Sequence, residues 1–347
     1  MNETDKPIRV MVAGIGGASL GTEIRKCLSL AGGYAIYGCD VSRTAYGLYE
    51  KEFVETRLVS KADYIADVLR ACREFDVQFL IPGGEQPMAL LGGASRSFEE
   101  NGIKLLANTP EVIALYSDKA RTFKRLSEYE ISIPKTVVIH STHDIATVGL
   151  PCIVKPATGS GGSAGVFFAI NVDEAMIYAQ FIERNGNQAV AQQYIDDSEG
   201  EFTIGVLSLP NGSVAGSIAL RRTLDAKLSV AYRSRGGLIS SGYSQGHIDE
   251  YHDLCRQAER IAEAIGSCGP INVQGRVQDG VLLPFEINPR FSASTFLRAL
   301  AGFNEIHTFI TYFKTGETPA RPRIKSGWYL RSLSEQFLPD EGLKRLK

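Results

Sequence analysis

The chain has 347 residues, and this length predicts more than one packed unit rather than a single small domain. Hydrophobic residues make up 44% and charged residues 22%, a balance that is typical of soluble globular proteins and argues against a disordered chain. The net charge is −2, with no basic stripe and no basic amphipathic helix. These features argue against binding to nucleic acid or to a membrane surface, whereas a small phosphate ligand needs only a few cations.

Cysteine spacing and the N-terminal segment indicate the compartment. The six cysteines form no CxxC pair, so we expect reduced thiols in the core rather than zinc ligands or disulfides. The segment MNETDKPIRV lacks the apolar stretch of a secretion signal, and no apolar run approaches the length of a membrane span. We therefore expect a cytoplasmic protein.

The first third of the chain alternates short apolar runs with amphipathic segments. Strands are predicted at residues 8–13, 35–39, 79–81 and 103–106. Between them, helices are predicted after the glycine-rich turn that follows residue 13, after Asp63 as an N-cap, and over residues 87–101. Alternating strands and helices predict a doubly wound parallel sheet of the α/β class, which we place at residues 1–115.

After Pro134 the pattern changes to an α+β order. Strands are predicted at residues 136–139, 152–155, 166–169, 189–195, 201–207, 213–221, 271–276 and 282–287, and helices at 172–185 and 249–265. Asn211-Gly212 and Asp279-Gly280 are typical turns of antiparallel hairpins. We expect a small lid at residues 116–190, a larger core at residues 191–320, and a tail at residues 321–347 to which no role is assigned.

A first glycine-rich turn, Gly14-Ile-Gly16-Gly17-Ala-Ser-Leu-Gly21, lies between a strand and a helix. Such a turn lets a phosphate approach the helix N-terminus, and Asp40 stands where an acid binds ribose in nicotinamide enzymes. The spacing differs from the strict dinucleotide fingerprint. The alternative that we favour is a tight turn that binds no dinucleotide.

A second glycine-rich loop, residues 159–165, follows Lys155-Pro156 at a strand end and leads into another strand. Successive glycine amides on such a hairpin can cover the β- and γ-phosphates of a nucleotide, and Lys155 supplies a point charge against them. The plain alternative is an ordinary surface loop.

Polar residues also cluster on two predicted strands near the C-terminus, in Asn272-Val-Gln274 and Glu286-Ile-Asn288-Pro289-Arg290. Residues two apart on a strand point to the same face, so Glu286 and Asn288 project together, and Gln274 can share that face. One carboxylate with amide oxygens suits a magnesium ion that also binds phosphate oxygens. Arg290 lies just beyond, where it can hold a transferring phosphoryl group. The alternative, an exposed polar strand face, is disfavoured because Pro289 ends the strand there.

Together these motifs resemble the ATP-grasp superfamily, and most closely one ATP-grasp unit of the carbamoyl-phosphate synthase large subunit. The matching segments, in chain order, are Ser117-Asp118-Lys119, Ile153-Val-Lys155-Pro156, the loop 159–165, Gln193-Tyr194-Ile195, Glu201-Phe202-Thr203, Asn272-Val-Gln274 and Glu286-Ile-Asn288-Pro289-Arg290. The resemblance implies an N-terminal Rossmann-like pre-ATP-grasp domain (1–115) followed by a two-lobed ATP-grasp domain with a lid subdomain (116–190) and a core subdomain (191–320).

The resemblance also implies roles for single residues. ATP phosphates would contact Lys119, Lys155 and the loop residues Gly159, Ser160, Gly161, Gly162 and Ser163. The adenine would meet the backbone of Gln193, Tyr194 and Ile195, and Glu201 would hold the ribose hydroxyls. Gln274, Glu286 and Asn288 would bind Mg²⁺ or Mn²⁺, and Arg290 would stabilise an acyl phosphate.

Candidate substrate contacts are Glu85, Arg233, Arg235 and Ser292. Glu85 follows a predicted strand of the parallel sheet, at the edge that ligands favour, and could meet a substrate amine. Arg233 and Arg235 belong to a cationic stretch beginning at Arg221, and arginine forks suit carboxylates. The alternative for Glu85 and for the arginines is a solvated surface loop.

This pattern predicts an ATP- and Mg²⁺-dependent ligase that joins a carboxylate to an amine, with small amino-acid-like substrates and no nucleic-acid or membrane partner. The chain carries one such unit, whereas carbamoyl-phosphate synthase carries a tandem pair, so full carbamoyl-phosphate synthesis is disfavoured. Three alternatives stay open: an ATP-grasp carboxylate kinase, an NAD-dependent oxidoreductase using the first glycine turn and Asp40, and a nucleotide-binding module without turnover. A homodimer is also left open.

Overall fold

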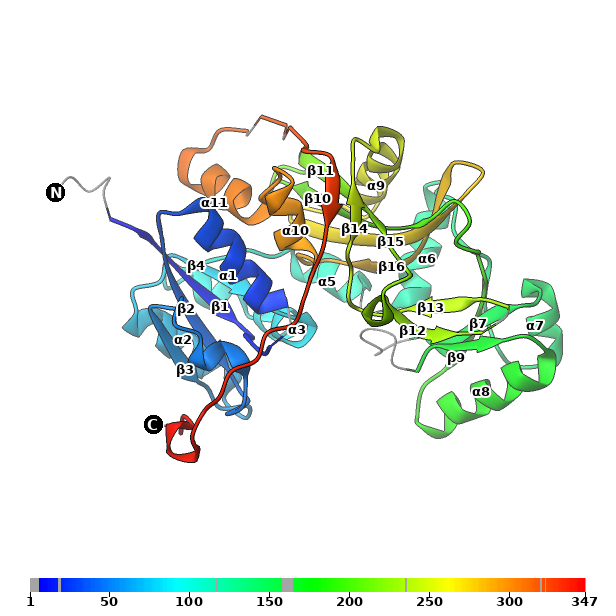
Figure 1. Ribbon diagram of the computed structural model, residues 1–347, viewed down its shortest axis with the longest axis horizontal. Helices are drawn as coiled ribbons and strands as arrows, with labels where there is room; N and C mark the ends of the chain where they lie inside the picture. Colours follow the sequence, from blue (N-terminus) through cyan, green and yellow to red (C-terminus); the bar gives the residue numbers. More distant parts are fainter. Residues whose placement is uncertain are drawn as a thin grey trace.

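The computed structural model of the protein describes residues 6–17, 20–116, 118–157, 165–234, 236–318, 320–321 and 323–346. These residues form a five-stranded, a four-stranded and a six-stranded sheet, together with one two-stranded hairpin. In Figure 1 the five-stranded sheet lies on the left, the six-stranded sheet in the upper centre, and the four-stranded sheet with its helices on the right. This arrangement is mixed α/β.

The five-stranded sheet is parallel throughout, as the alternation of strands and helices predicted. Its strands, in spatial order, are β3 (Glu55–Leu58), β2 (Tyr34–Asp40), β1 (Ile8–Ala13), β4 (Phe79–Pro82) and β5 (Lys104–Leu105). Val10 and Val12 of β1 pack in one core with Ile24, whereas Met11 packs in another core with Val68. Because side chains alternate along a strand, both faces of the sheet are covered.

The helices of this region are α1 (Leu20–Ala31), α2 (Tyr64–Glu74), α3 (Glu85–Gly93), α4 (Ser95–Glu99) and the 3₁₀ turn η2 (Tyr46–Tyr49). The single helix predicted over residues 87–101 is wrong, because α3 ends at Gly93 and α4 starts at Ser95. Glycine weakens a helix, so Gly92 and Gly93 favour this break. A Cβ on Gly92 would lie 2.5 Å from Cδ1 of Ile113, so glycine there also permits close packing of the next helix.

The four-stranded sheet is antiparallel and consists, in spatial order, of β6 (Thr136–Val138), β9 (Ala189–Gln193), β7 (Cys152–Pro156) and β8 (Phe167–Ala169). The helices α7 (Thr142–Val148) and α8 (Val172–Arg184) pack on it through a core that includes Ile145, Ala179 and Val154. Strand β9 crosses the domain limit that we expected at residue 190. The domain limits themselves stay predictions.

The six-stranded sheet is antiparallel and consists, in spatial order, of β16 (Val281–Asn288), β15 (Pro270–Gln278), β10 (Glu201–Ser208), β11 (Val214–Arg222), β14 (Gly246–Ile248) and β17 (Gly327–Tyr329). The predicted turn between β15 and β16 is confirmed: Asp279 and Gly280 have φ angles of 53° and 73°, as such a hairpin turn requires. The hairpin of β12 (Val230–Arg233) and β13 (Leu238–Ser240) stands apart as its own two-stranded sheet.

Five further helices surround this sheet: α5 (Pro110–Tyr116), α6 (Lys119–Glu128), α9 (His252–Ala264), α10 (Thr295–Leu300) and α11 (Glu305–Thr315), with short 3₁₀ turns η3 (Lys227–Ser229) and η4 (Asp340–Gly342). Helices α10 and α11 pack against α1 of the parallel sheet. Leu28 of α1, Ile306 of α11 and Leu220 of β11 belong to one continuous core. The parallel sheet and the six-stranded sheet therefore share buried apolar surface, which joins the two parts firmly.

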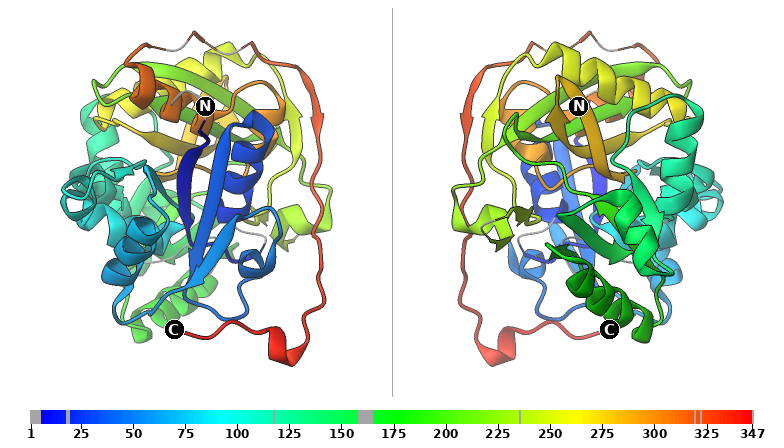
Figure 2. Two further views of the ribbon diagram at one scale, coloured as in Figure 1. Left: turned by 90° about the vertical axis from the view of Figure 1, so that its left-hand side faces the viewer. Right: turned by 90° about the vertical axis from the view of Figure 1, so that its right-hand side faces the viewer.

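The C-terminal tail returns from the six-stranded sheet to the parallel sheet. Strand β17 pairs with β14 at the sheet edge, and the chain then descends along one side of the molecule (Figures 1 and 2). On the way, Arg331 donates to Glu23 at 3.0 Å, Gln336 donates to the carbonyl of Tyr46 at 2.8 Å, and Lys344 donates to the carbonyl of Thr56 at 2.9 Å. The tail thus spans both parts of the molecule.

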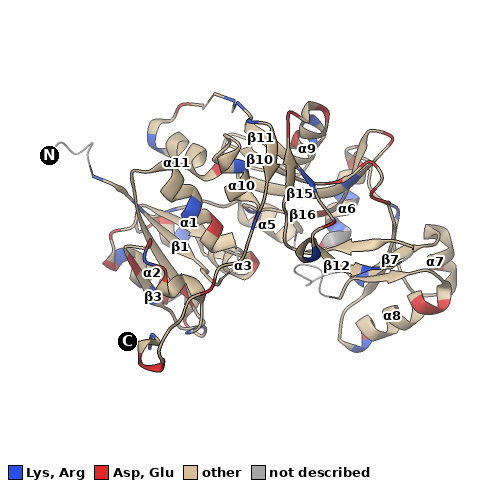
Figure 3. Cartoon of the chain, in the orientation of Figure 1, with Lys and Arg blue, Asp and Glu red and all other residues tan. Residues whose placement is uncertain are grey.

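Within the described residues, no helix has the length and apolarity that crossing a bilayer would require. Basic and acidic residues both occur around each of the three sheets (Figure 3). Four of the six cysteines, Cys27, Cys39, Cys72 and Cys152, are buried free thiols, as expected for small core residues.

Candidate functional site

A pocket lies where the four-stranded and six-stranded sheets meet, and the hairpin β12–β13 closes part of it through β13. Its walls combine β7 and β9 with β10, β15 and β16. The sequence-predicted residues that line it are Lys155, Gln193, Tyr194, Ile195, Glu201, Gln274, Glu286, Arg290 and Ser292. Residues that lie up to 137 positions apart in the sequence, from Lys155 to Ser292, therefore share one cavity.

Lys155 comes from the centre of β7 and reaches across the pocket to the six-stranded sheet. Its Nζ donates to Oε1 of Gln192 at 2.8 Å and to the carbonyl oxygen of Phe285 at 3.2 Å. The side chain is 5% exposed, and Nζ also lies 5.6 Å from the ring centre of Phe123. These contacts hold the Lys155 side chain at the pocket, where an ammonium can act as a point charge for an anion.

A bulge in β16 explains why the carbonyl of Phe285 is available. Gln274 pairs with Glu286, but the next residue, Gly275, pairs with Pro284, so Phe285 has no opposite residue. Proline has no N–H to give to a ladder, and β16 is the edge strand of its sheet, where proline is tolerated. The unpaired Phe285 turns its carbonyl toward Lys155.

The predicted metal ligands lie on β15 and β16. Gln274 and Glu286 are directly opposite in register and both line the pocket. In the part of the chain that the structure describes, no hydrogen bond or ion pair engages the carboxylate of Glu286. Asn288 lies two residues beyond Glu286, opposite Asn272, but it is 7% exposed and does not line the pocket.

One carboxylate and an amide oxygen are the hard oxygen donors that Mg²⁺ shares with phosphate, so Gln274 and Glu286 fit this ion. No group of three or more His, Cys, Asp or Glu side chains that could hold a metal occurs in the described ranges. The predicted set differs from such a group because it has a single acid, so phosphate oxygens would have to complete the coordination.

The segment after β9 forms the side of the pocket where the adenine is predicted. The amide of Gln193 donates to the carbonyl of Lys135 at 2.8 Å, and the carbonyl of Ile195 accepts from Arg276 at 2.6 Å. The Tyr194 hydroxyl accepts from the amide of Leu238 at 3.0 Å, and its ring packs edge-on against Phe168 at 4.9 Å. These contacts join the segment to β13 and fix its course.

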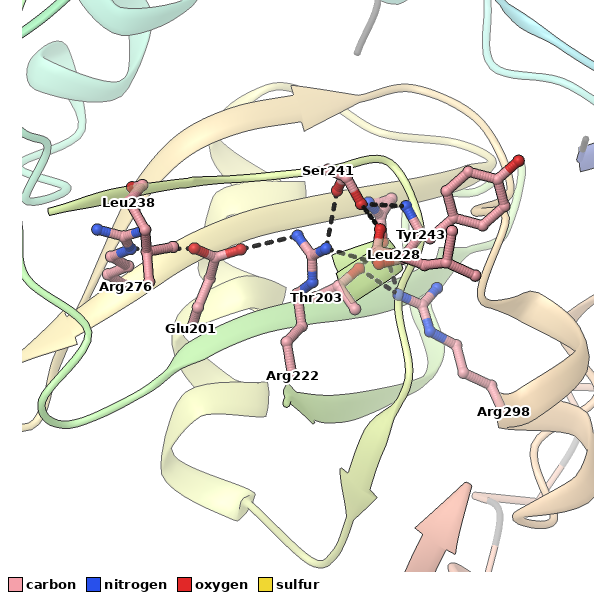
Figure 4. Close-up of polar contacts among 10 residues, drawn as sticks. Glu201, Thr203, Arg222, Leu228, Leu238, Ser241, Tyr243, Arg276 and Arg298 are labelled. Atoms are coloured by element: carbon pink, nitrogen blue, oxygen red, sulfur yellow. Dashed lines mark hydrogen bonds and ion pairs between the residues drawn. The ribbon is translucent and has the colours of Figure 1, made fainter. Parts of the chain in front are cut away.

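Glu201, predicted to hold ribose hydroxyls, is buried between two arginines (Figure 4). Its Oε1 accepts from Arg222 at 2.7 Å and its Oε2 accepts from Arg276 at 3.0 Å. Burial lowers the pKa of Arg222. For Arg276, burial acts in the same direction, but the charges and hydrogen bonds of Glu201 and Tyr194 together outweigh it, so the pKa of Arg276 is raised. The ribose role of Glu201 stays a prediction.

Arg290 links the pocket to the parallel sheet. Its Nη2 donates to Oε1 of Glu85 at 2.9 Å, and its Nη1 donates to the carbonyl of Phe291 at 3.0 Å. Glu85 begins α3 directly after β4, at the edge of the parallel sheet where ligands are expected. Ser292 is buried and its hydroxyl pairs with that of Ser294 at 2.8 Å. Arg290 and Ser292 thus line the pocket, whereas Glu85 is not in its lining and is connected to it through Arg290.

Other predicted residues lie elsewhere. Arg233 is not in the pocket lining, and its Nη2 donates to the carbonyl of Leu224 at 2.6 Å. Arg235 and the loop residues Gly159, Ser160, Gly161, Gly162 and Ser163 lie outside the described residues. Lys119 is the first residue of α6, and its side chain lies outside the described part of the chain.

The first glycine turn is built for packing. A Cβ on Gly21 or on Gly83 would lie 1.9 Å or 2.0 Å from the carbonyl oxygen of Gly14, so only glycines allow this close approach. Both carboxylate oxygens of Asp40 accept backbone amides, from Ile15 at 2.8 Å and from residue 42 at 2.9 Å. These contacts favour the tight-turn interpretation over a dinucleotide site.

Family models match two overlapping stretches of the chain. Residues 116–230 match the RimK-like ATP-grasp domain, and residues 199–336 match a family described as ATP-grasp in the biosynthetic pathway with Ter operon. Together they span the four-stranded sheet, the six-stranded sheet and the pocket.

The chain contains an ATP-grasp domain.

A curated relative of the ATP-grasp chain is the carbamoyl phosphate synthase large chain of Rhizobium meliloti (strain 1021), which is 25% identical over 263 residues. The match covers 67% of this chain but only 22% of the relative, so the chain spans about a fifth of that protein's length.

Two solved structures share the fold. The biotin carboxylase domain of Hydrogenobacter thermophilus 2-oxoglutarate carboxylase, crystallised with MgADP, ADP and bicarbonate, matches with a TM-score of 0.65 and 17% identity, over 89% of this chain and 70% of that one. The L-amino acid ligase from Bacillus licheniformis matches with a TM-score of 0.64 and 14% identity, over 88% of this chain and 74% of that one. ATP-grasp enzymes use ATP and Mg²⁺.

Sequence reasoning missed several residues of the pocket. Arg276 is two residues beyond Gln274 on β15, so the period-2 argument made for Gln274 also applied to Arg276. Arg222 belongs to the cationic stretch for which a substrate contact or a solvated loop was expected, but it is 5% exposed, paired with Glu201 and not in the pocket lining. The serine-rich segment after β13 also lines the pocket, and no pattern in the sequence signalled it.

Proposed function

We propose that this protein is an ATP- and Mg²⁺-dependent ligase that joins a carboxylate to an amine through an acyl phosphate. The observation that carries the proposal is one pocket lined by Lys155, Gln274, Glu286 and Arg290. A buried ammonium, one carboxylate with an amide, and a guanidinium form a set suited to phosphoryl transfer to a carboxylate. The match to ATP-grasp families and the fold shared with an L-amino acid ligase support it.

In the proposed reaction, a carboxylate oxygen of one substrate attacks the γ-phosphorus of ATP, and ADP leaves with the bonding electrons. Lys155 neutralises negative charge on the phosphates from its buried position, without having to move. Gln274 and Glu286 would hold a magnesium ion, which supplies further neutralisation of the triphosphate when bound. Arg290 orients the acyl phosphate by hydrogen bonds from its guanidinium.

In the second step, the amine nitrogen attacks the acyl carbon, phosphate leaves, and the amine gives up a proton. Glu85 and Ser292 are the proposed contacts for the amine substrate, on the side of the pocket that faces the parallel sheet. Water must be kept out because it would hydrolyse the acyl phosphate, and we assign that closure to the loop 159–165.

The finer organisation belongs to the same proposal. We infer a Rossmann-like pre-ATP-grasp domain for residues 1–115, a lid subdomain for 116–190, a core subdomain for 191–320, and a C-terminal tail from 321. The strand order β3-β2-β1-β4-β5 supports the first of these. Amino-acid-like substrates, a cytoplasmic location and a possible homodimer are further parts of the proposal.

The site bears on two other functions that the sequence left open, an NAD-dependent oxidoreductase and a carboxylate kinase. The oxidoreductase would need Asp40 for ribose, but its carboxylate already accepts two backbone amides. The carboxylate kinase would use the same pocket and release the acyl phosphate. The kinase differs from the ligase in needing one substrate instead of two before ADP accumulates.

The test is an ADP-release assay with pairs of amino acids and related carboxylates, with mass spectrometry of the products. We expect ADP to accumulate only when a carboxylate and an amine are both present, and an amide product to match the pair. Glu286→Gln should keep the wild-type melting temperature and lose most of the Mg²⁺-dependent turnover. ADP release from a single carboxylate would favour the kinase, and full activity of Glu286→Gln would contradict the assigned metal site.

A further inference from the structure

Three charged side chains are buried together at one wall of the pocket, which Glu201 and Arg276 line. Glu201, Arg222 and Arg276 are 1%, 1% and 6% exposed as side chains. Glu201 begins β10 and lies opposite Arg276 on β15, while Arg222 ends β11 on the other side. A single carboxylate is thus placed between two guanidiniums, and each of its oxygens accepts a hydrogen bond from one of them.

Arg222 also donates to the segment that follows β13, through its Nη2. Its Nη2 donates to the carbonyl of Ser241 at 2.7 Å and to the carbonyl of Tyr243 at 2.8 Å (Figure 4). Ser241 lines the pocket and lies just after β13 has ended, so its carbonyl has no strand partner. Buried carbonyls outside regular structure need such donors, and a guanidinium can serve two at once.

Arg276 holds a second part of the same wall. Its Nη1 donates to the carbonyl of Ile195 at 2.6 Å and its Nη2 donates to the carbonyl of Leu238 at 3.1 Å. Both of these residues line the pocket. The guanidinium also packs over the ring of Tyr194, with its Cζ 5.0 Å from the ring centre. Arg276 therefore ties the predicted adenine-binding segment to the hairpin that faces it.

The arrangement needs Glu201 as a counter-charge. Two buried guanidiniums without an anion would be strongly destabilising, and Glu201 reduces the net charge of the three groups from +2 to +1. The negative charge of Glu286 also acts on Arg222. Both oxygens of Glu201 are thereby engaged by protein donors, which differs from the ribose contact that the sequence resemblance implied.

We propose that Arg222 and Arg276 are positioning residues that brace the nucleotide pocket: through Glu201, they fix Ile195 and the segment 238–243 as two facing walls. This inference rests on the proposed ATP site. Glu201 then acts on the nucleotide indirectly, because it holds the two arginines in place. The arginines in turn fix four backbone carbonyls of the pocket walls, those of Ile195, Leu238, Ser241 and Tyr243.

The test compares the full chain with Arg222→Lys, Arg276→Lys and Glu201→Gln. Arg25→Lys is the matched control, because Arg25 pairs with Glu50 at 3.2 Å with side chains 8% and 11% exposed, away from the pocket. Calorimetry gives the Kd for MgATP and for its 2′,3′-dideoxy analogue, and hydrogen exchange without nucleotide reports on residues 238–243. Melting temperatures show whether each variant is folded.

We expect Arg222→Lys, Arg276→Lys and Glu201→Gln each to raise the Kd for both nucleotides by the same factor. This factor should be roughly tenfold for the loss of one charged hydrogen bond. Exchange at residues 238–243 should accelerate in these variants and stay at the wild-type rate in Arg25→Lys. If Glu201→Gln alone removes the preference for ATP over the dideoxy analogue, while both arginine variants bind like the control, the brace is wrong and Glu201 is a ribose ligand.

Two further outcomes separate this inference from the proposed function. A wild-type chain that binds no adenine nucleotide would overturn the proposed function and the nucleotide role of the brace with it. A wild-type chain that binds ATP, with unchanged exchange and binding in the arginine variants, would overturn the brace alone.

If the arginine variants fail to fold, Tyr194→Phe tests the same wall without touching a buried charge. It removes the hydroxyl that accepts from the amide of Leu238 at 3.0 Å. Weaker ATP binding with faster exchange at residue 238 supports the brace, and wild-type values in both measurements contradict it.

Discussion

Arg290 and Glu85 form the contact through which the parallel sheet reaches the pocket. Their ion pair is 2.9 Å long, with side chains 17% and 42% exposed, so solvent screens it and its contribution to stability is small. Its importance is for function: the carboxylate orients a guanidinium that we assign to the acyl phosphate. Arg290 also donates to the neighbouring carbonyl of Phe291, and this hydrogen bond should keep the guanidinium near its position when Glu85 is changed.

Glu85→Gln should separate the contribution of the Glu85–Arg290 ion pair to stability from its contribution to function. The amide keeps the shape and an acceptor but loses the negative charge, so the melting temperature should stay close to wild type. Because the variant removes the charge that we assign to the amine contact, kcat/KM for the amine substrate should fall by roughly tenfold or more, and KM for ATP should stay unchanged.

Steady-state kinetics with each substrate varied in turn measures this effect. Glu99→Gln is the control, because Glu99 also pairs with a basic residue, Lys104 at 3.1 Å, but contacts no residue assigned to the site and is not in the pocket lining. An unchanged kinetic constant for the amine in Glu85→Gln would remove Glu85 from the substrate site.

At the scale of elements, Asn108 holds the two strands that carry the predicted metal ligands. It follows β5 and is 5% exposed. Its Nδ2 donates to the carbonyls of Pro270 at 2.8 Å and Pro289 at 3.3 Å, and its Oδ1 accepts from the amide of Cys268 at 2.9 Å and the hydroxyl of Ser267 at 3.0 Å. Pro270 begins β15 and Pro289 follows β16, so one amide fixes both strand ends.

Asn108→Ala should therefore destabilise the fold by about 2–4 kcal/mol, since several buried backbone groups lose their partner at once. Urea unfolding of the full chain measures the change in free energy. Asn101→Ala is the control, because Asn101 is exposed and donates only to the carbonyl of Ser97 at 2.9 Å. Equal, small changes in the two variants would show that the buried amide does not bind the strands together.

At the scale of the whole molecule, the tail connects parts that the chain order separates. Arg331 donates to Glu23 of α1 and to the carbonyl of Ala293, a residue that lines the pocket, while its own amide donates to Gln245. One tail residue thereby contacts the helix beside the parallel sheet, the segment after Arg290, and the loop before β14.

Arg331→Met should loosen the tail. Glu23 keeps Lys26 at 2.8 Å, so the loss of stability should be modest, about 1–3 kcal/mol. Chymotrypsin should cut faster in the tail, where Trp328 and Phe337 are 68% and 90% exposed. Arg256→Met, at an exposed ion pair on α9, is the control and should be cut like wild type. Wild-type cleavage of Arg331→Met would show that other contacts hold the tail.

Local patterns decided which strands form and which faces they present. Alternation within β15 and β16 predicted that Gln274 can share a face with Glu286, and the turn residues Asp279 and Gly280 indicated the hairpin; the structure then places the two side chains opposite each other. Local patterns did not predict features that depend on tertiary packing. The single helix expected over residues 87–101 is interrupted at Ala94, next to Gly92, which allows close packing against Ile113.

The sequence by itself determined the parallel and antiparallel regions and the strand pair that carries Gln274 and Glu286, because these follow from spacing along the chain. The motifs of an ATP-grasp domain were identified by their resemblance to that superfamily. Only the tertiary structure decided that Glu201 is held by Arg222 and Arg276, and that Glu85 meets Arg290. These contacts join residues from separate strands and sheets. Their ionic and hydrogen-bonding partners depend on how the sheets pack, which no local periodicity encodes.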